Sequence, residues 1–160
     1  MVVNPTSDEL DLSLLALFAG WAMQDEVQRR LVADGFGDLR FNDGVVIQHV
    51  LAGPLTITAL ADRMGVTQQA ASKAVADLER RGVLTRRPAP DDGRARLLHL
   101  TKHGTAAVEA ARAHRAALDA EVTARWGAER VAGTRSLLRE ILTRFDADDT
   151  VRHRRVRPPA

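Results

Sequence analysis

The spacing of apolar residues predicts a chain made mainly of helices. Between Leu10 and Met23, leucines and aromatic residues recur every three or four positions, which is the period of an α-helix. Further apolar residues widen this stripe beyond one packed face, and Thr6 with Glu9 has the spacing of a helix-capping box. We therefore expect a first helix over residues 6–34 that is buried on two sides. The second side is either the interior of a monomer or a second subunit, and the width of the stripe favours a subunit interface.

Three shorter helices are predicted next, over residues 43–52, 58–64 and 68–81. Gly65 supplies the positive φ that a sharp turn needs, and Thr67 is placed to cap the last of the three. Two helices joined by a short turn that contains glycine form the helix-turn-helix pattern, although generic helical hairpins share much of it.

The last of these helices separates polar from apolar residues. When successive residues are advanced by about 100°, six of its polar side chains fall within an arc of roughly 140°: Gln68, Gln69, Ser72, Lys73, Glu79 and Arg80. Amide, hydroxyl and amino groups of this kind can hydrogen-bond to base edges and phosphates in a DNA major groove. An ordinary amphipathic surface helix shows the same pattern, so this segment alone does not decide between the two interpretations.

A basic β-hairpin is predicted directly after this helix. Residues 83–87 and 94–101 have the composition of strands, and a loop rich in proline, aspartate and glycine separates them. Four arginines bracket the tip: Arg86, Arg87, Arg94 and Arg96. A hairpin in this position is a wing, whose arginines reach flanking phosphates or a narrow minor groove. The alternative is a solvated hairpin edge that its charges protect from aggregation.

Positive charge is concentrated in this central region. Residues 61–101 contain eight lysines and arginines against five carboxylates, a net charge of +3, whereas the whole chain has a formal net charge of +2. Two long helices, over about 102–125 and 128–146, follow and are expected to pair with the first helix of a second subunit. Residues 147–160 form a basic tail that we expect to be disordered.

The composition excludes several functional classes. Among its 160 residues the chain has no cysteine, which excludes disulfides, thiolate zinc ligation and cysteine-based redox sensing. It has no apolar run near the ~20 residues that span a bilayer and no secretory signal at its start, so we expect a cytoplasmic protein that does not enter membranes. Nucleotide-binding, zinc-protease and serine-hydrolase motifs are missing, so we expect neither an enzyme nor a cofactor. The histidines lack metal-ligand spacing, because His99 and His103 lie on either side of a strand-to-helix junction.

Three motifs carry a family resemblance: residues 60–73, residues 78–82, and a wing motif with residues 91–96, Leu100, Thr101 and Gly104. On these motifs the chain resembles the multiple-antibiotic-resistance regulator (MarR) family. The order of helices extends the resemblance over about residues 8–146, although the outer helices match in character rather than in residues. The resemblance implies a mainly α-helical fold with a small β-hairpin wing. It places a winged helix-turn-helix lobe at 43–101 and dimerisation helices at 6–34 and 102–146.

The resemblance also implies a homodimer that binds a pseudo-palindromic operator in double-stranded DNA, and we expect a repressor. The residues assigned to the recognition helix are Thr67, Gln68, Gln69, Ser72, Lys73 and Arg80. Those assigned to the wing are Arg86, Arg87, Asp92, Arg94 and Arg96. In the family pattern Arg94 enters the minor groove and Asp92 braces it. Gly93 stands where many members have an arginine, which would weaken or reshape this contact.

In many members of the family a small phenolic or anionic ligand binds between the dimer helices and the DNA-binding lobe and loosens DNA. By position, the candidates to line such a site here are Phe18, Trp21, Phe36, Arg40 and His49. Ordinary core or surface roles are the alternative for these residues.

The sequence therefore predicts a ligand-responsive, DNA-binding transcription regulator. The alternative is a winged-helix module that binds another protein and has no sequence-specific role on DNA. Gln68, Lys73 and Arg94 favour DNA, because a protein-binding module would be expected to have a neutral recognition face or an acidic wing. Asp91 and Asp92 resemble a catalytic carboxylate pair, but turn formation in an exposed loop explains them better.

Overall fold

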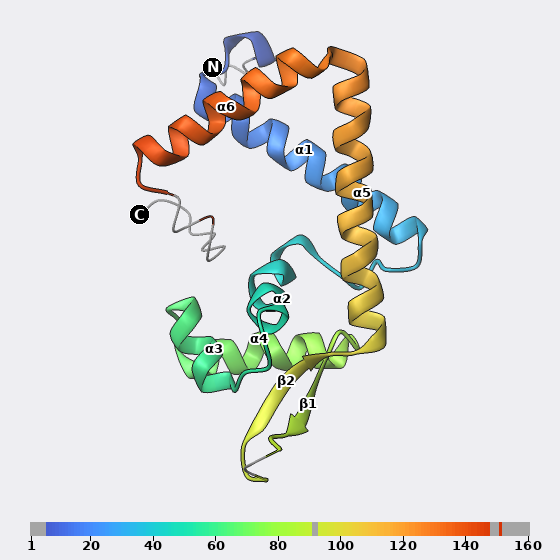
Figure 1. Cartoon of the computed structure of the whole chain (residues 1–160), viewed down its shortest axis with the longest axis vertical. Coiled ribbons are helices and arrows are strands. Elements are labelled where there is room, and N and C mark those ends of the chain that lie inside the picture. The colour runs from blue at the N-terminus through green and yellow to red at the C-terminus, as the bar shows by residue number, and fades with distance from the viewer. Residues whose placement is uncertain (1–5, 91–92, 148–150, 152–160) are drawn as a thin grey trace, which may run out of the picture.

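The computed structural model describes residues 6–90, 93–147 and 151, and in this part the chain is mainly helical (Figure 1). A two-stranded antiparallel hairpin is its β component, so the predicted fold class is confirmed. The elements are a 3-10 turn at Ser7–Glu9, α1 (Leu12–Ala33), a 3-10 turn at Phe41–Asp43, α2 (Gly44–Leu51), α3 (Ile57–Met64), α4 (Gln68–Arg80), β1 (Leu84–Pro88), β2 (Arg96–Leu100), α5 (Lys102–Trp126) and α6 (Ala128–Arg144).

Helices α1, α5 and α6 form an open frame on one side of the molecule, and α2, α3, α4 and the hairpin form a lobe on the other (Figure 1). Arg30 of α1 fixes the crossing with α5, because its two terminal nitrogens donate to Glu121 at 2.9 and 2.8 Å. Its Nε donates to Glu26 at 2.7 Å. The hydrogen bonds from Arg30 lower the pKa of both carboxyl groups. Among the described residues, no helix is long and apolar enough to cross a bilayer.

The lobe has a core of aliphatic side chains from all its elements. The largest side chains that are completely buried are Leu60, Val75, Leu78, Val83 and Leu98. Leu98 also extends the sheet, because its amide donates to the carbonyl of Leu55 at 2.9 Å and the two residues form an antiparallel bridge. This core holds α4 and the hairpin in fixed relative positions.

Two glycines end the helices of the helix-turn-helix. Gly65 follows α3 with φ of 64°, and Gly82 follows α4 with φ of 72°. In both turns the next amide reaches back to close the helix end: Val66 N donates to Ala61 O at 3.1 Å, and Val83 N donates to Leu78 O at 2.9 Å. L-residues other than glycine rarely adopt this backbone conformation, so both glycines are required by the turns.

The first helix differs from the prediction at its start. The Thr6–Glu9 capping box is present, with Thr6 N donating to Glu9 Oε2 at 2.8 Å, but it caps a short 3-10 turn. The α-helix begins after Asp11, whose carboxylate accepts from Leu14 N at 3.0 Å. The prediction of one helix from residue 6 is therefore wrong, because the second cap starts the α-helix later. At the other end of the chain, most of the predicted basic tail lies outside the described residues.

Candidate nucleic-acid interface and an adjoining arginine-lined pocket

Helix α4 is anchored by one face and leaves the other open to solvent. Thr67 caps it, with its hydroxyl oxygen accepting from Ala70 N at 3.2 Å. Ala71, Val75 and Leu78 are at most 1% exposed, so every third or fourth residue is fixed in the core of the lobe. The side chains on the opposite face therefore have a defined position while they remain accessible.

The open face of α4 carries the polar residues that the sequence predicted for it. Gln68, Gln69 and Lys73 are exposed, and Ser72 is half-buried. Within the described part of the chain, none of these four side chains has a hydrogen-bonding or ionic partner. Their donors and acceptors are available to a ligand without the loss of an internal contact.

The carboxyl end of α4 is different, because its charges are already paired. Arg80 is exposed and forms an ion pair with Asp77 one turn earlier. Glu79 forms an ion pair with Arg86 of the wing, with Arg86 Nη2 2.9 Å from Glu79 Oε2. Arg80 and Arg86 therefore offer less free positive charge than the sequence alone suggests.

The wing arginines are divided between the two faces of the hairpin. Arg86 pairs in register with the buried Leu98, and Arg96 pairs with Pro88, so Arg86 and Arg96 share one face. Arg87 pairs with Leu97 and lies on the other face. Arg87, Arg94 and Arg96 are all exposed, whereas Asp92 lies outside the described residues.

Arg81 lies in a dense ionic cluster behind α4. We use the term Arg81 cluster for Arg81, Asp43, Asp77 and the carbonyl oxygen of Asp38. The Arg81 side chain is 10% exposed, and its nitrogens donate to Asp43 at 2.6 and 2.8 Å, to Asp77 at 2.7 and 3.0 Å, and to Asp38 O at 2.5 Å. The hydrogen bonds with Asp43 raise the pKa of Arg81, and the hydrogen bond from Arg81 lowers the pKa of Asp77.

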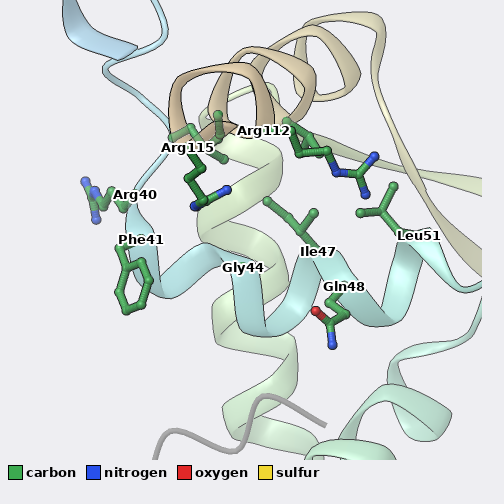
Figure 2. Close-up of a pocket in the computed structure, with 11 residues that line it drawn as sticks. Arg40, Phe41, Gly44, Ile47, Gln48, Leu51, Arg112 and Arg115 are labelled. Atoms are coloured by element: carbon green, nitrogen blue, oxygen red, sulfur yellow. The ribbon is translucent and has the colours of Figure 1, made fainter. Parts of the chain in front are cut away.

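A pocket of about 110 Å³ lies between α2, α5 and the segment that precedes α2. Figure 2 shows three cationic side chains at this pocket, Arg40 from the preceding segment and Arg112 and Arg115 from α5. Phe41 and apolar residues of α2, including Ile47 and Leu51, complete the lining (Figure 2). An apolar wall with several guanidinium groups is suited to a small anion with an aromatic or aliphatic body.

The five residues predicted to line a ligand site are not brought together. Only Arg40 lines the pocket. Phe18 and Trp21 contact each other edge to face on α1, with ring centroids 5.4 Å apart, and both are exposed. The rings of Phe36 and His103 pack together with their centroids 5.5 Å apart. His49 lies in α2 and is buried, with 6% of its surface exposed. The other four predicted residues therefore lie elsewhere: Phe18 and Trp21 are exposed on α1, Phe36 packs against His103, and His49 is buried in the lobe.

The arginines of α5 were missed at the sequence level. Val108, Ala111, Arg112 and Arg115 all line the pocket, and their spacing of three, four and seven places them on one helix face. That spacing was readable in the sequence, but the partner surface on α2 was not. Among the described residues no group of three or more potential metal ligands was found.

The lobe that contains α4 and the wing is also the part of the chain that matches a known protein family. Residues 38–95, which include α2, α3, α4 and β1 and end just before β2, match the model of the MarR family. The resemblance to the MarR family is confirmed. The MarR-family match lies in the lobe that presents α4 and the wing. A search of curated proteins found no match.

Solved structures of MarR-family and similar proteins share the fold of more than four fifths of the chain. YusO of Bacillus subtilis is 24% identical, with a TM-score of 0.63 and coverage of 82% of this chain and 91% of that chain. A MepR mutant of S. aureus bound to an oligodeoxyribonucleotide is 20% identical, with a TM-score of 0.60 and coverage of 86% and 99%. A MarR family protein of Mycobacterium tuberculosis in complex with salicylic acid is 28% identical, with a TM-score of 0.56 and coverage of 85% and 99%. These likenesses show that the chain shares the fold of these proteins.

Proposed function

We propose that this protein is a transcriptional repressor that binds a pseudo-palindromic operator as a homodimer and is released by a small anionic ligand. The observation that carries the proposal is the open face of α4. Gln68, Gln69 and Lys73 are exposed and have no partner among the described residues, while Ala71, Val75 and Leu78 anchor the opposite face in the core. Such a helix can enter a major groove without rearrangement, and glutamine amides can form paired hydrogen bonds with adenine.

The wing supplies the second contact of the proposed interface. The hairpin that follows α4 extends away from the helices of the lobe (Figure 1), and its Arg87, Arg94 and Arg96 are exposed. In this arrangement Arg94 contacts the minor groove beside the α4 site, and Arg87 contacts phosphates. Phosphate contacts contribute most of the salt dependence, whereas base contacts by α4 determine sequence preference.

The apolar surface of α1 supports a homodimer. Seven large apolar side chains of its first twelve residues are 40–55% exposed in the single chain: Leu12, Leu14, Leu15, Leu17, Phe18, Trp21 and Met23. On α6 and just after it, Leu137, Leu138 and Phe145 are also exposed. A patch of this extent is unusual on a monomer and is typical of a surface buried between subunits. A symmetric pair of lobes would match a two-fold operator with half-sites about one helical turn apart.

The arginine-lined pocket supports the ligand part of the proposal. It lies between α5 of the frame and α2 of the lobe, where an occupant changes how the two parts pack. Arg40, Arg112 and Arg115 favour a carboxylate or phenolate, and Phe41 with Ile47 favours a flat apolar body. The mycobacterial relative was solved with salicylic acid, which has this chemistry.

Substitution of Gln69 and of Arg94 is expected to affect DNA binding in different ways. Gln69→Ala should change the preferred bases and reduce discrimination at one position of each half-site by about 1–3 kcal/mol, because the amide reads a base edge. Arg94→Ala should weaken binding to all sequences and lower the slope of log affinity against log salt by about one per site, because a cation placed in the minor groove between the two phosphate backbones is lost. Fluorescence anisotropy on a set of duplexes over a range of salt concentrations measures both effects.

Arg139→Ala is the matched control for Arg94→Ala, because it removes one exposed arginine from α6, outside the lobe. Its affinity and salt slope should equal those of the unmodified protein. An unchanged base preference for Gln69→Ala would show that α4 does not read bases through this residue.

Arg112→Gln is expected to weaken the binding of salicylate about tenfold or more. The guanidinium provides a charge-assisted hydrogen bond to the carboxylate, and its loss costs about 1.5–3 kcal/mol. Isothermal titration calorimetry measures the change, with salicylamide as a ligand that lacks the charge. Arg125→Gln is the control on the same helix, because Arg125 does not line the pocket. Equal salicylate affinities for both variants would rule out the pocket as the ligand site.

The alternative function, a protein-binding winged helix without sequence-specific DNA binding, predicts a different experiment. A tagged protein incubated with lysate would retain its partner after nuclease treatment if the contact is with protein. Loss of all co-purified material after nuclease treatment supports the DNA-binding proposal.

A further inference from the structure

We propose that Arg81 is a positioning residue that transmits occupancy of the arginine-lined pocket to the recognition helix α4. This inference rests on the proposed function, because it assigns residues to the communication between a ligand site and a DNA-binding face. Arg81 itself touches neither site. It caps the carboxyl end of α4, whereas Gln68 and Gln69 lie at the amino end.

One short segment contacts both the pocket and the Arg81 cluster. Leu39, Arg40, Phe41 and Gly44 line the pocket. In the same segment, Asp43 accepts from Arg81 with both carboxylate oxygens, at 2.6 and 2.8 Å. Asp43 also ties the segment internally, because its Oδ2 accepts from the backbone amide of Arg40 at 2.7 Å. A ligand that displaces the pocket wall therefore moves the main partner of Arg81.

A movement of Asp43 is expected to move Arg81 with it, because the hydrogen bonds of the Arg81 cluster are costly to break. A guanidinium has five N–H donors, and Arg81 makes five hydrogen bonds to Asp43, Asp77 and the carbonyl of Asp38. The side chain is 10% exposed, so water has little room to replace a broken bond. Breaking one bond would leave a charged group poorly solvated, and this cost favours joint movement of the segment and the end of α4.

Arg40 gives the ligand a means to act on this cluster. Its Nη1 lies 3.8 Å from Asp77 Oδ2, and the same Asp77 oxygen accepts from Arg81 at 2.7 Å. Arg40 is also part of the pocket lining. An anion in the pocket competes with Asp77 for Arg40, so the ligand binds better to an arrangement in which the Arg40–Asp77 ion pair is broken than to one in which it is intact. A difference of this kind is what a ligand needs to shift a conformational equilibrium.

The test measures DNA affinity with and without salicylate for the full-length protein and its variants. In the unmodified protein, salicylate should weaken DNA binding about tenfold, within the usual range of coupling between sites. Arg81→Lys keeps a positive charge but cannot bond to Asp43 and Asp77 together in the same way. It should fold and bind both DNA and salicylate, while the effect of salicylate on DNA affinity falls to less than about twofold.

Arg80→Met is the matched control. Arg80 is the neighbouring residue and also pairs with Asp77, but among the described residues its exposed side chain has no hydrogen bond or ion pair with the segment before α2. Arg80→Met should bind DNA more weakly both with and without salicylate. The ratio of the two DNA affinities should equal that of the unmodified protein. A purely structural role of Arg81 would be rescued by lysine, whereas a role in transmission would not.

Asp77→Asn provides a second, independent variant, because Asp77 is more exposed than Arg81 and its loss is less disruptive. Asp77→Asn should also reduce the ratio of DNA affinity without salicylate to DNA affinity with salicylate. Hydrogen exchange gives a further readout: salicylate should alter exchange at residues 77–83 in the unmodified protein and not in Arg81→Lys. If both variants keep the full salicylate response, the role of Arg81 is refuted and the proposed function stands. If the unmodified protein binds DNA without any salicylate response, the ligand part of the proposed function fails, and the role of Arg81 fails with it.

Discussion

Replacing Leu17 and Trp21 together by glutamate is expected to dissociate the proposed dimer and to lower DNA affinity about a hundredfold or more. The two side chains are 44% and 54% exposed in the single chain and lie in the apolar row of α1. Burial of four carboxylates in a two-fold apolar interface carries a large desolvation cost. A monomer then binds each half-site separately. It loses the additional affinity that a dimer obtains when its two lobes bind both half-sites at once. Sedimentation velocity and fluorescence anisotropy measure the two effects.

Val32→Glu is the control for this prediction. Val32 is 58% exposed and lies near the other end of the same helix, outside the apolar row of its first half. This variant should remain a dimer and bind DNA normally. A monomeric unmodified protein, or a double variant that is still dimeric, would contradict the proposed interface.

Gly104→Ala is expected to lower the free energy of unfolding by about 3 kcal/mol. Gly104 lies in the first turn of α5, where a Cβ would overlap the carbonyl oxygen of Val83 and lie 3.2 Å from Leu100 Cδ2. The carbonyl cannot easily move away, because it accepts from Thr101 N at 3.1 Å. The start of α5 would therefore have to shift away from the hairpin. Urea denaturation followed by circular dichroism measures the loss.

The control is Gly133→Ala, within α6, where an added Cβ has no atom within 4 Å. Alanine is the better helix former, so this variant should be more stable by about 0.5–1 kcal/mol. Equal effects of the two substitutions would show that the contact between α5 and Val83 is looser than the structure indicates.

Local features of the lobe were predictable from the sequence because they depend on neighbouring residues. The cap at Thr67 and the positive φ of Gly65 and Gly82 follow from residue type and spacing, and the structure contains all three. The start of the first helix was less predictable. Two capping signals, at Thr6 and Asp11, compete there, and only the second begins the α-helix.

The site could be predicted only in part, for a physical reason. The polar face of α4 is a property of one helix, so its period in the sequence was sufficient to find it. The Arg81 cluster joins residues that are distant in sequence, since Asp43 lies 38 positions from Arg81. The pocket likewise requires α2 and α5 to pack together, so its arginines on α5 were missed. The sequence favours aromatic residues of α1 as ligand contacts, but the structure exposes Phe18 and Trp21 on the frame.

The central claim is that α4 and the wing read a two-fold DNA sequence. Selection of bound duplexes from a random pool by the purified full-length protein, followed by sequencing, tests it most directly. We expect enrichment of an inverted repeat with half-sites about one helical turn apart. We also expect that Gln69→Ala shifts the bases at one position of each half-site. Recovery of the random pool without enrichment would contradict the account.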